Sequence, residues 1–121
     1  MAERVTLTVK DTEGIRTFEI TGDLKGELEI RPLKAALDAE VDGGARQFVI
    51  DLGRVGLVNS LGIGILVACL TAVRKRGGDV KLAAASRRVL RALEHCRLLD
   101  VVDHYDTAQE ARESFRQPPS A

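Results

Sequence analysis

The sequence is poor in aromatic residues and cysteine, and it has no excess of charge of either sign. Its 121 residues include three Phe, one Tyr and no Trp, so it lacks a set of rings for stacking on bases or sugars. Eighteen basic residues balance eighteen acidic ones, and this balance argues against a nucleic-acid-binding surface. Two cysteines, Cys69 and Cys96, are too few for a disulfide framework and predict reduced, partly buried thiols.

Long hydrophobic runs are also absent. The longest apolar run, residues 61–70, is about half of what a membrane-spanning helix requires, and residues 1–10 contain no hydrophobic core of a signal peptide. We therefore expect a cytoplasmic protein that does not insert into membranes. A chain of this length buries enough surface to fold as one domain, which we place at residues 1–116, with a flexible C-terminal tail at 117–121.

Hydrophobic periodicity predicts an α/β fold. Alternation within residues 5–10 and 15–20 predicts two antiparallel strands joined by a turn at 11–14. Short apolar runs predict three further strands, at 48–52, 80–84 and 101–102. Apolar residues at spacings of three and four predict four helices, within 30–41, 60–76, 86–96 and 107–115. The order β-β-α-β-α-β-α-β-α implies a mixed sheet of about five strands with about four helices.

Single residues mark the ends and the buried faces of these helices. Pro32 fits only the first turn of its helix, where a backbone N–H is not needed. Ser60 directly precedes an apolar helix, which is a position typical of an N-cap. That helix is apolar on nearly every side, so we expect both Leu66 and Thr71 to be buried within it.

No catalytic or metal site is predicted. Ser60 followed by Gly62 is similar to a nucleophile elbow, but Val58 stands where that sharp turn needs Gly. The two possible bases, His95 and His104, have no clear path to Ser60, and we expect surface or structural roles for them. No phosphate-binding loop and no metal-ligand spacing is present. We therefore expect a protein that is not an enzyme and has no cofactor.

The surroundings of Ser60 suggest more than a helix cap. The loop before it, residues 55–58, is apolar, and Gly62 and Gly64 cost helix propensity of about 1 kcal/mol each. Glycines in the first turn leave the helix start uncovered, so another protein can approach closely. A phosphoryl group on Ser60 would lie at the positive end of the helix dipole, beside free N–H groups. These features predict a modifiable serine on a mostly apolar binding surface.

Three motifs together carry a resemblance to a known family. They are Val-Ile-Asp-Leu at 49–52, Val-Asn-Ser-Leu-Gly-Ile-Gly at 58–64, and Gly77-Gly78 before a Lys-Leu strand. With them, residues 5–115 resemble a STAS domain of the bacterial anti-sigma factor antagonist type. The family pattern is an apolar residue followed by Asp-Ser-x-Gly-Leu-Gly, and Ser60 matches its phosphorylated serine. The sequence departs from the pattern at two positions. The family usually has Asp at the position of Asn59, and it often has Asp at the position of Lys25.

The resemblance implies a phosphorylation-controlled partner switch. The unphosphorylated protein would bind an anti-sigma factor that is itself a GHKL-type serine kinase, and phosphorylation of Ser60 would release it. A serine/threonine phosphatase would reset the switch. The expected contact face joins a loop, a turn and the start of a helix, comprising Asp23, Leu24, Lys25, Leu57, Val58, Asn59, Leu61, Gly62 and Ile63.

Other functions remain open for the same fold. One is a STAS subunit of a membrane lipid-transport ABC complex, and another is a signalling scaffold, neither of which would use phosphorylation. A small hydrolase using Ser60 is disfavoured by the missing catalytic partners. An apolar helix start suits a homodimer as well as another partner, so we expect a monomer or a weak homodimer.

Overall fold

The computed structural model describes residues 5–25 and 27–116, with the backbone alone for 27–30. An antiparallel hairpin of β1 (Thr6–Thr12) and β2 (Ile15–Thr21) opens the sheet. Next come β3 (Gln47–Arg54), β4 (Asp79–Ala83) and β5 (His104–Tyr105), each parallel to the strand beside it. The strand order is β1-β2-β3-β4-β5, which confirms the predicted mixed sheet.

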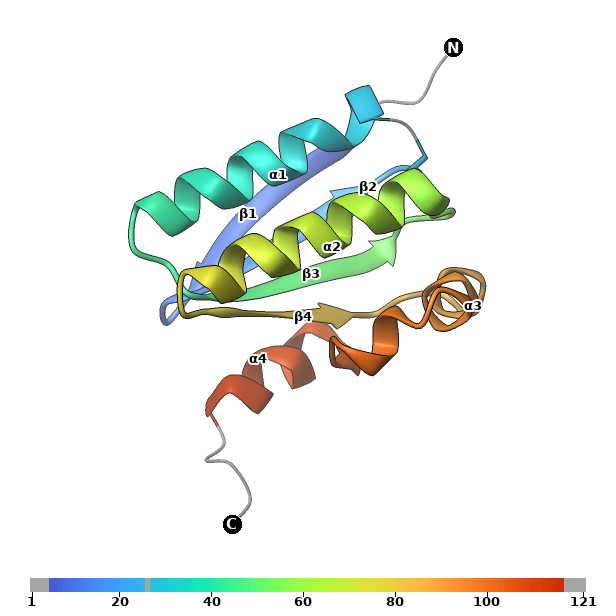
Figure 1. Ribbon diagram of the computed structural model, residues 1–121. Coiled ribbons are helices and arrows are strands. Elements are labelled where there is room, and N and C mark those ends of the chain that lie inside the picture. Colours follow the sequence, from blue (N-terminus) through green and yellow to red (C-terminus); the bar gives the residue numbers. More distant parts are fainter. Residues whose placement is uncertain (1–4, 26, 117–121) are drawn as a thin grey trace.

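Helices cover both faces of this sheet, but unequally. Figure 1 shows α1 (Glu27–Asp42) and α2 (Ser60–Lys75) side by side across one face. The second face is covered in part by α4 (Ala108–Arg116), which packs on β3 and β4. The remaining helix, α3 (Arg87–His95), lies at the end of the sheet where β3 ends and α2 begins.

Strand alternation sorts the core between these two faces. Phe18 and Phe48 are fully buried and meet edge to face, with ring centroids 5.8 Å apart, in the cluster that includes residues of α1 and α2. Their strand neighbours point the other way, so Val49 packs with Ala111 of α4. The buried Thr17 hydroxyl satisfies its polarity by accepting a hydrogen bond of 3.1 Å from Arg112 of α4.

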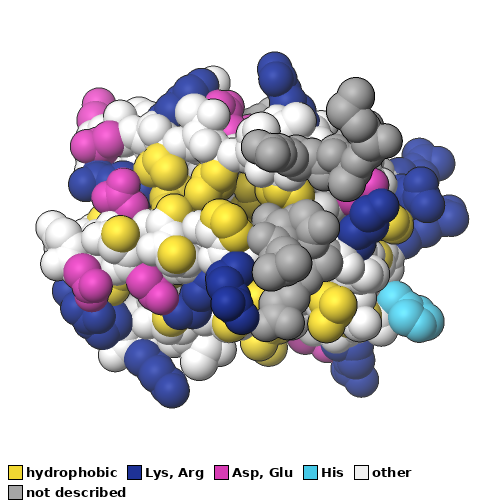
Figure 2. All heavy atoms as spheres, turned by 90° about the horizontal axis from the view of Figure 1, so that it is seen from above, with side chains coloured by type: hydrophobic (Ala, Val, Ile, Leu, Met, Phe, Trp, Pro, Cys, Tyr) yellow, Lys and Arg dark blue, Asp and Glu magenta, His cyan; other side chains and the backbone are white. Residues whose placement is uncertain are grey.

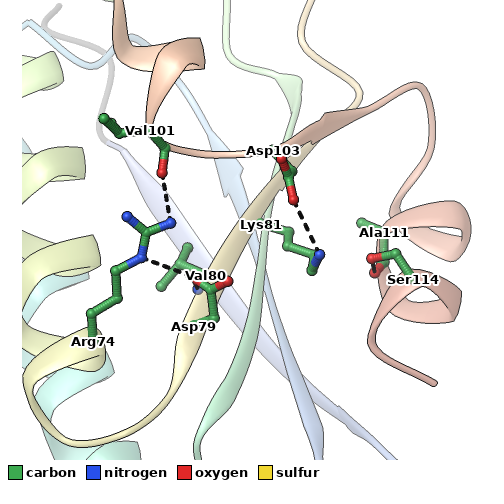
Figure 3. A network of polar contacts seen from close by, with 8 residues as sticks. All are labelled: Arg74, Asp79, Val80, Lys81, Val101, Asp103, Ala111 and Ser114. Carbon is green, nitrogen blue, oxygen red and sulfur yellow. Dashed lines mark hydrogen bonds and ion pairs between the residues drawn. The ribbon is translucent and has the colours of Figure 1, made fainter. Parts of the chain in front are cut away.

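A polar network ties the C-terminal part of the fold to β4 (Figure 3). Arg74, near the end of α2, donates hydrogen bonds to the Asp79 carboxylate at 3.0 Å and to the Val101 carbonyl oxygen at 2.6 Å. The Lys81 ammonium lies 3.4 Å from the Asp103 carboxylate. It also lies 4.9 Å from the centroid of the Phe115 ring of α4. These contacts hold β5 and α4 in place beside β4.

The last strand differs from its prediction. It lies at His104–Tyr105, whereas residues 98–100 form a short 3-10 helix and the predicted strand at 101–102 is a turn. Val102 is buried under that turn, but Val101 is 53% exposed. The two adjacent valines therefore indicate one buried side chain and not a strand, because two residues are too few to show the alternation of a strand.

Three expectations for single residues are also wrong. Pro32 lies in the second turn of α1 because the helix begins at Glu27; burial of Leu33 and Leu37 on the core face offsets the missing backbone hydrogen bond. Thr71 is exposed, because α2 buries one face and Thr71 lies on the other. Cys96 is exposed at the end of α3.

Other expectations are confirmed or lie outside the described residues. Leu66 and Cys69 are buried in α2 as predicted. The helix predicted within 86–96 is α3, and Ser86 is its N-cap, with the Ser86 hydroxyl accepting a hydrogen bond from the Val89 backbone N–H at 3.2 Å. The predicted tail at 117–121 falls outside the described part of the chain. Within the described segments, none of the helices has the length and hydropathy to cross a membrane.

Candidate functional site

Ser60 is the first residue of α2, and Asn59 is the N-cap. The Asn59 side-chain oxygen accepts a hydrogen bond from the Gly62 backbone N–H at 3.1 Å, with Asn59 in an extended conformation. The prediction that Ser60 caps the helix is therefore wrong by one residue. Asn and Ser are equally good caps, and Asn59 is held in that role by a second bond: its amide donates to the Lys25 carbonyl oxygen at 2.8 Å. Ser60 is exposed, and its hydroxyl makes no hydrogen bond within the described residues.

Two segments far apart in the sequence form this site. The Leu24 backbone N–H donates to the Leu57 carbonyl oxygen at 2.8 Å, and the Asn59 N–H donates to the Leu24 carbonyl oxygen at 3.1 Å. Leu24 and Val58 form a parallel bridge, and both side chains are buried. The loop after β2 and the turn before α2 are therefore one unit that presents Ser60.

The two glycines of the motif have different roles. Gly62 is buried against the Leu24 backbone, where a Cβ would collide with the Leu24 carbonyl oxygen. Gly62 therefore permits close packing and does not uncover the helix start. Gly64 is exposed, and a Cβ there would meet nothing within 4 Å. The expectation that glycine opens this surface to a partner thus fits Gly64 alone.

The predicted contact residues divide by burial. Leu24, Val58 and Gly62 are buried, so they support the surface from beneath. The other predicted residues are exposed or half-buried, namely Asp23, Lys25, Leu57, Asn59, Leu61 and Ile63. One further exposed apolar side chain on α2 was not among the predicted contact residues: Val67, which is 40% exposed. The signal that could have found it is the helical spacing from the serine: Gly64 and Val67 lie four and seven residues after Ser60, on the same side of α2.

Charge around Ser60 is sparse. Asp23 and Lys25 form an ion pair at 3.9 Å, so the loop carries no net charge. Leu61, the residue after the serine, is 55% exposed and apolar. The first turn of α2 contains no acidic residue to offset the positive end of the helix, whereas its last turn has Arg74 and Lys75. A negative group on Ser60 would meet a favourable field there.

Within the described part of the chain, no side chain makes a hydrogen bond to the Ser60 hydroxyl, and each histidine is placed elsewhere. The His104 Nε2 atom accepts a hydrogen bond from the Ala85 backbone N–H at 3.1 Å, which confirms a structural role, and burial lowers the pKa of His104. His95 is exposed on α3. Burial raises the pKa of the Cys69 thiol to about 12, so that thiol is unreactive. Among the described residues, no group of three or more His, Cys, Asp and Glu side chains could hold a metal ion.

A hollow with a volume of about 860 Å³ lies at the opposite end of the parallel strands, where β2, β3 and β4 begin. It is lined in part by Arg16, Arg46 and Lys81. These cations already have partners: Arg16 pairs with Glu40 at 3.3 Å, and Arg46 donates to two carbonyl oxygens at the end of α1. The hollow is therefore separate from the serine site, and each of these three cations already has a partner.

The fold and the serine turn define a STAS domain. Residues 6–111 match the model of the STAS domain family. The chain therefore belongs to the STAS domain family, as its serine motif and element order predicted.

Known relatives are similar over most of the chain. BtrV of Bordetella bronchiseptica, named as a candidate anti-sigma factor antagonist, is 27% identical over 84 residues, which cover 69% of this chain and 72% of BtrV. The crystal structure of an anti-sigma factor antagonist from Mycobacterium paratuberculosis is 24% identical, with a TM-score of 0.84, covering 97% of this chain and 100% of the other. SpoIIAA, a Bacillus cell fate determinant, has a phosphorylated structure that is 16% identical, with a TM-score of 0.71, covering 92% and 100% of the two chains.

Proposed function

We propose that this protein is an anti-sigma factor antagonist that changes partners through phosphorylation of Ser60. The observation that carries the proposal is the separation of two roles at the start of α2. Asn59 caps the helix, while the Ser60 hydroxyl beside it is exposed and unbonded within the described residues. The names of BtrV and of the Mycobacterium structure, and the phosphorylated form of SpoIIAA, support the same function.

In the unphosphorylated state, the exposed apolar surface at Leu61, Gly64 and Val67 binds an anti-sigma factor that is a GHKL-type serine kinase. This binding removes the anti-sigma factor from its sigma factor, which becomes free for transcription. The protein acts in the cytoplasm, as a monomer or weak homodimer. Asp23, Lys25, Leu57, Asn59 and Ile63 form the rest of the contact surface.

Phosphorylation then reverses the binding. The kinase transfers the γ-phosphoryl group of ATP to the Ser60 Oγ: the bond to the ADP leaving group breaks, an Oγ–P bond forms, and the hydroxyl proton passes to a base of the kinase. Here the protein is the substrate and not the catalyst. The phosphoryl group adds about two negative charges to an apolar contact surface and weakens the complex. A metal-dependent serine/threonine phosphatase hydrolyses the phosphoserine and resets the switch.

The fold tolerates this modification because the cap does not depend on it. The Asn59 bonds to Gly62 and to Lys25 remain when Ser60 is modified. A phosphate at the first helical position also lies at the positive end of α2, where its charge is stabilising. Phosphorylation should therefore change the surface and leave the α2 start folded.

Labelling with radioactive ATP tests the proposal. Wild type is incubated with GHKL-type kinases from the same genome, beside the variants Ser60→Ala, Thr71→Ala and Ser86→Ala. Thr71 and Ser86 are exposed hydroxyls on α2 and before α3, so they serve as matched controls. We expect one phosphate per chain in wild type and both controls, and none in Ser60→Ala. Label at the wild-type rate in Ser60→Ala would refute the assignment, and recovery of an ABC ATPase as the bound partner would favour a transporter subunit.

A further inference from the structure

Four exposed arginines make no ion pair or side-chain hydrogen bond within the described residues: Arg54 at the end of β3, and three that lie together on α3. Arg16, Arg76 and Arg97 have acidic partners within 3.3 Å. By contrast, all of α3's arginines are exposed and make no ion pair or hydrogen bond within the described residues. They are Arg87, Arg88 and Arg91, and we call them the arginine face.

The arginine face is unfavourable for α3 itself. Arg87 and Arg88 lie in the first turn, which has no acidic residue, so their charges oppose the positive end of the helix. Arg91 lies four residues after Arg87 and three after Arg88, and these spacings bring like charges together on one side of the helix. Only Glu94 adds a negative charge to the exposed side of α3. The stability of the helix therefore gives no reason for these three residues.

The arginine face lies at the Ser60 end of the molecule. In Figure 1, α3 is at the end of the sheet where β3 leads into α2, and Figure 2 shows Lys and Arg side chains gathered at that right-hand end. Ala84, three residues before α3, lies beside Gly53 near the end of β3, the strand that leads to α2. A partner that covers Ser60 can extend from α2 onto α3.

We infer that the arginine face binds an acidic protein surface on the partner that docks at Ser60; this inference rests on the proposed function. Charge complementarity identifies the occupant. The serine turn presents the uncharged Asn59 beside the Asp23–Lys25 ion pair, so it carries no net negative charge that would repel an acidic surface. Phosphorylation of Ser60 then adds negative charge next to the docked acidic surface, and the partner leaves.

A protein surface is favoured over nucleic acid or anionic lipid. The chain has no net charge, so it lacks the long-range field that attracts a polyanion. Three arginines within two turns match a short group of carboxylates, with which guanidinium forms bidentate bonds. The exposed side of α3 presents no large apolar side chain to enter a bilayer.

Association kinetics test the inference with the kinase that labels Ser60 as the probe. The variant Arg87→Glu/Arg88→Glu should lower the association rate constant about tenfold at 50 mM NaCl and much less at 500 mM, with the dissociation rate constant changed less than about threefold. The control Lys75→Glu/Arg76→Glu makes the same charge change at the other end of α2 and should lower the rate constant less than about threefold. Equal rate constants for the two variants would overturn the inference.

Two further measurements separate this inference from misfolding and from failure of the proposed function. Arg87→Glu/Arg88→Glu places acidic residues in the first turn of α3, so its Tm should equal or exceed that of wild type. At a saturating concentration, the kinase should still label Ser60 in this variant. Slow association with normal labelling supports both proposals. Normal association with normal labelling would refute the role of the arginine face and leave the proposed function standing.

If no kinase labels Ser60, a peptide of ten glutamates replaces it as the probe. The peptide should shift the backbone amide signals of residues 87–91 in wild type at 150 mM NaCl, and not in Arg87→Glu/Arg88→Glu. A 12-base-pair DNA duplex and phosphatidylserine vesicles are measured in parallel. Tighter binding of either one, or shifts that persist in the variant, would overturn the assignment to an acidic protein surface.

Discussion

Gly62 packs directly on the Leu24 carbonyl oxygen, with no room between them for a Cβ. This contact seats the start of α2 on the loop that follows β2. Two residues on, Gly64 faces open space on the same helix. Substituting each of these two glycines by alanine therefore compares a closely packed position with an exposed one in the same helix.

Gly62→Ala should destabilise the protein by about 1–3 kcal/mol, because either the loop or the helix must move to admit a methyl group. Gly64→Ala should be neutral or should stabilise the fold by up to about 1 kcal/mol, because alanine favours the helix. Urea unfolding of both variants measures these differences. Equal destabilisation by the two substitutions would contradict the contact at Gly62.

Asn59→Ala should cost about 0.5–2 kcal/mol, because it removes the N-cap bond to the Gly62 N–H. Ser60→Ala should change the free energy of unfolding by less than about 0.5 kcal/mol, as expected for an exposed residue outside the cap. Asn59→Asp keeps a capping oxygen and should restore the stability that Asn59→Ala loses. Thermal or urea unfolding of the three variants would show the reverse order if Ser60 were the true cap.

Ser60→Asp should remain folded but bind the partner kinase more weakly than wild type. A single carboxylate imitates a phosphate dianion only in part, so the expected loss is about 1–3 kcal/mol of binding free energy. Ser60→Ala is the control and should bind about as well as wild type. Isothermal titration calorimetry measures both, and identical affinities for the Asp and Ala variants would exclude release by charge.

Acid should destabilise the protein through His104. Burial lowers the pKa of His104 from its ordinary value of 6.5, with Asp106 acting weakly in the opposite direction. The unfolded chain therefore binds a proton more readily than the folded one, so the free energy of unfolding falls as the pH decreases below about 6.5. Protonation also removes the Nε2 acceptor used by the Ala85 N–H.

Urea unfolding between pH 7.5 and 5.5 checks this pH dependence. His104→Gln should flatten the curve. His95→Gln, at an exposed histidine, is the matched control. A curve that keeps its full slope in His104→Gln would assign the proton uptake to another group.

The sequence predicted the strands and helices with long periodic patterns, and it located the serine within the fold. Alternation in β2, the apolar run in β3 and the helical spacing in α2 follow directly from burial on one or both faces. The two-residue strand β5 has no period to detect, so the neighbouring valines were mistaken for it. Apolar runs of about five residues were long enough to indicate β3 and β4, whereas two adjacent valines were too short to indicate a strand.

The details of the site depended on contacts that no local pattern contains. Asn59 and Ser60 are both suitable caps, and the choice is made by a bond from Asn59 to Lys25, 34 residues earlier in the chain. Gly62 and Gly64 are the same residue type in the same helix turn, and only the position of Leu24 distinguishes them. The sequence could therefore identify the members of the site but could not assign their roles.

The different environments of the two cysteines give the protein a built-in attachment point. Cys69 is fully buried with its pKa raised to about 12, so it forms almost no thiolate at neutral pH. Cys96 is exposed at the end of α3. A maleimide dye should therefore couple to the native chain at one site, on the same helix as the arginine face, and report on that helix without any engineered residue.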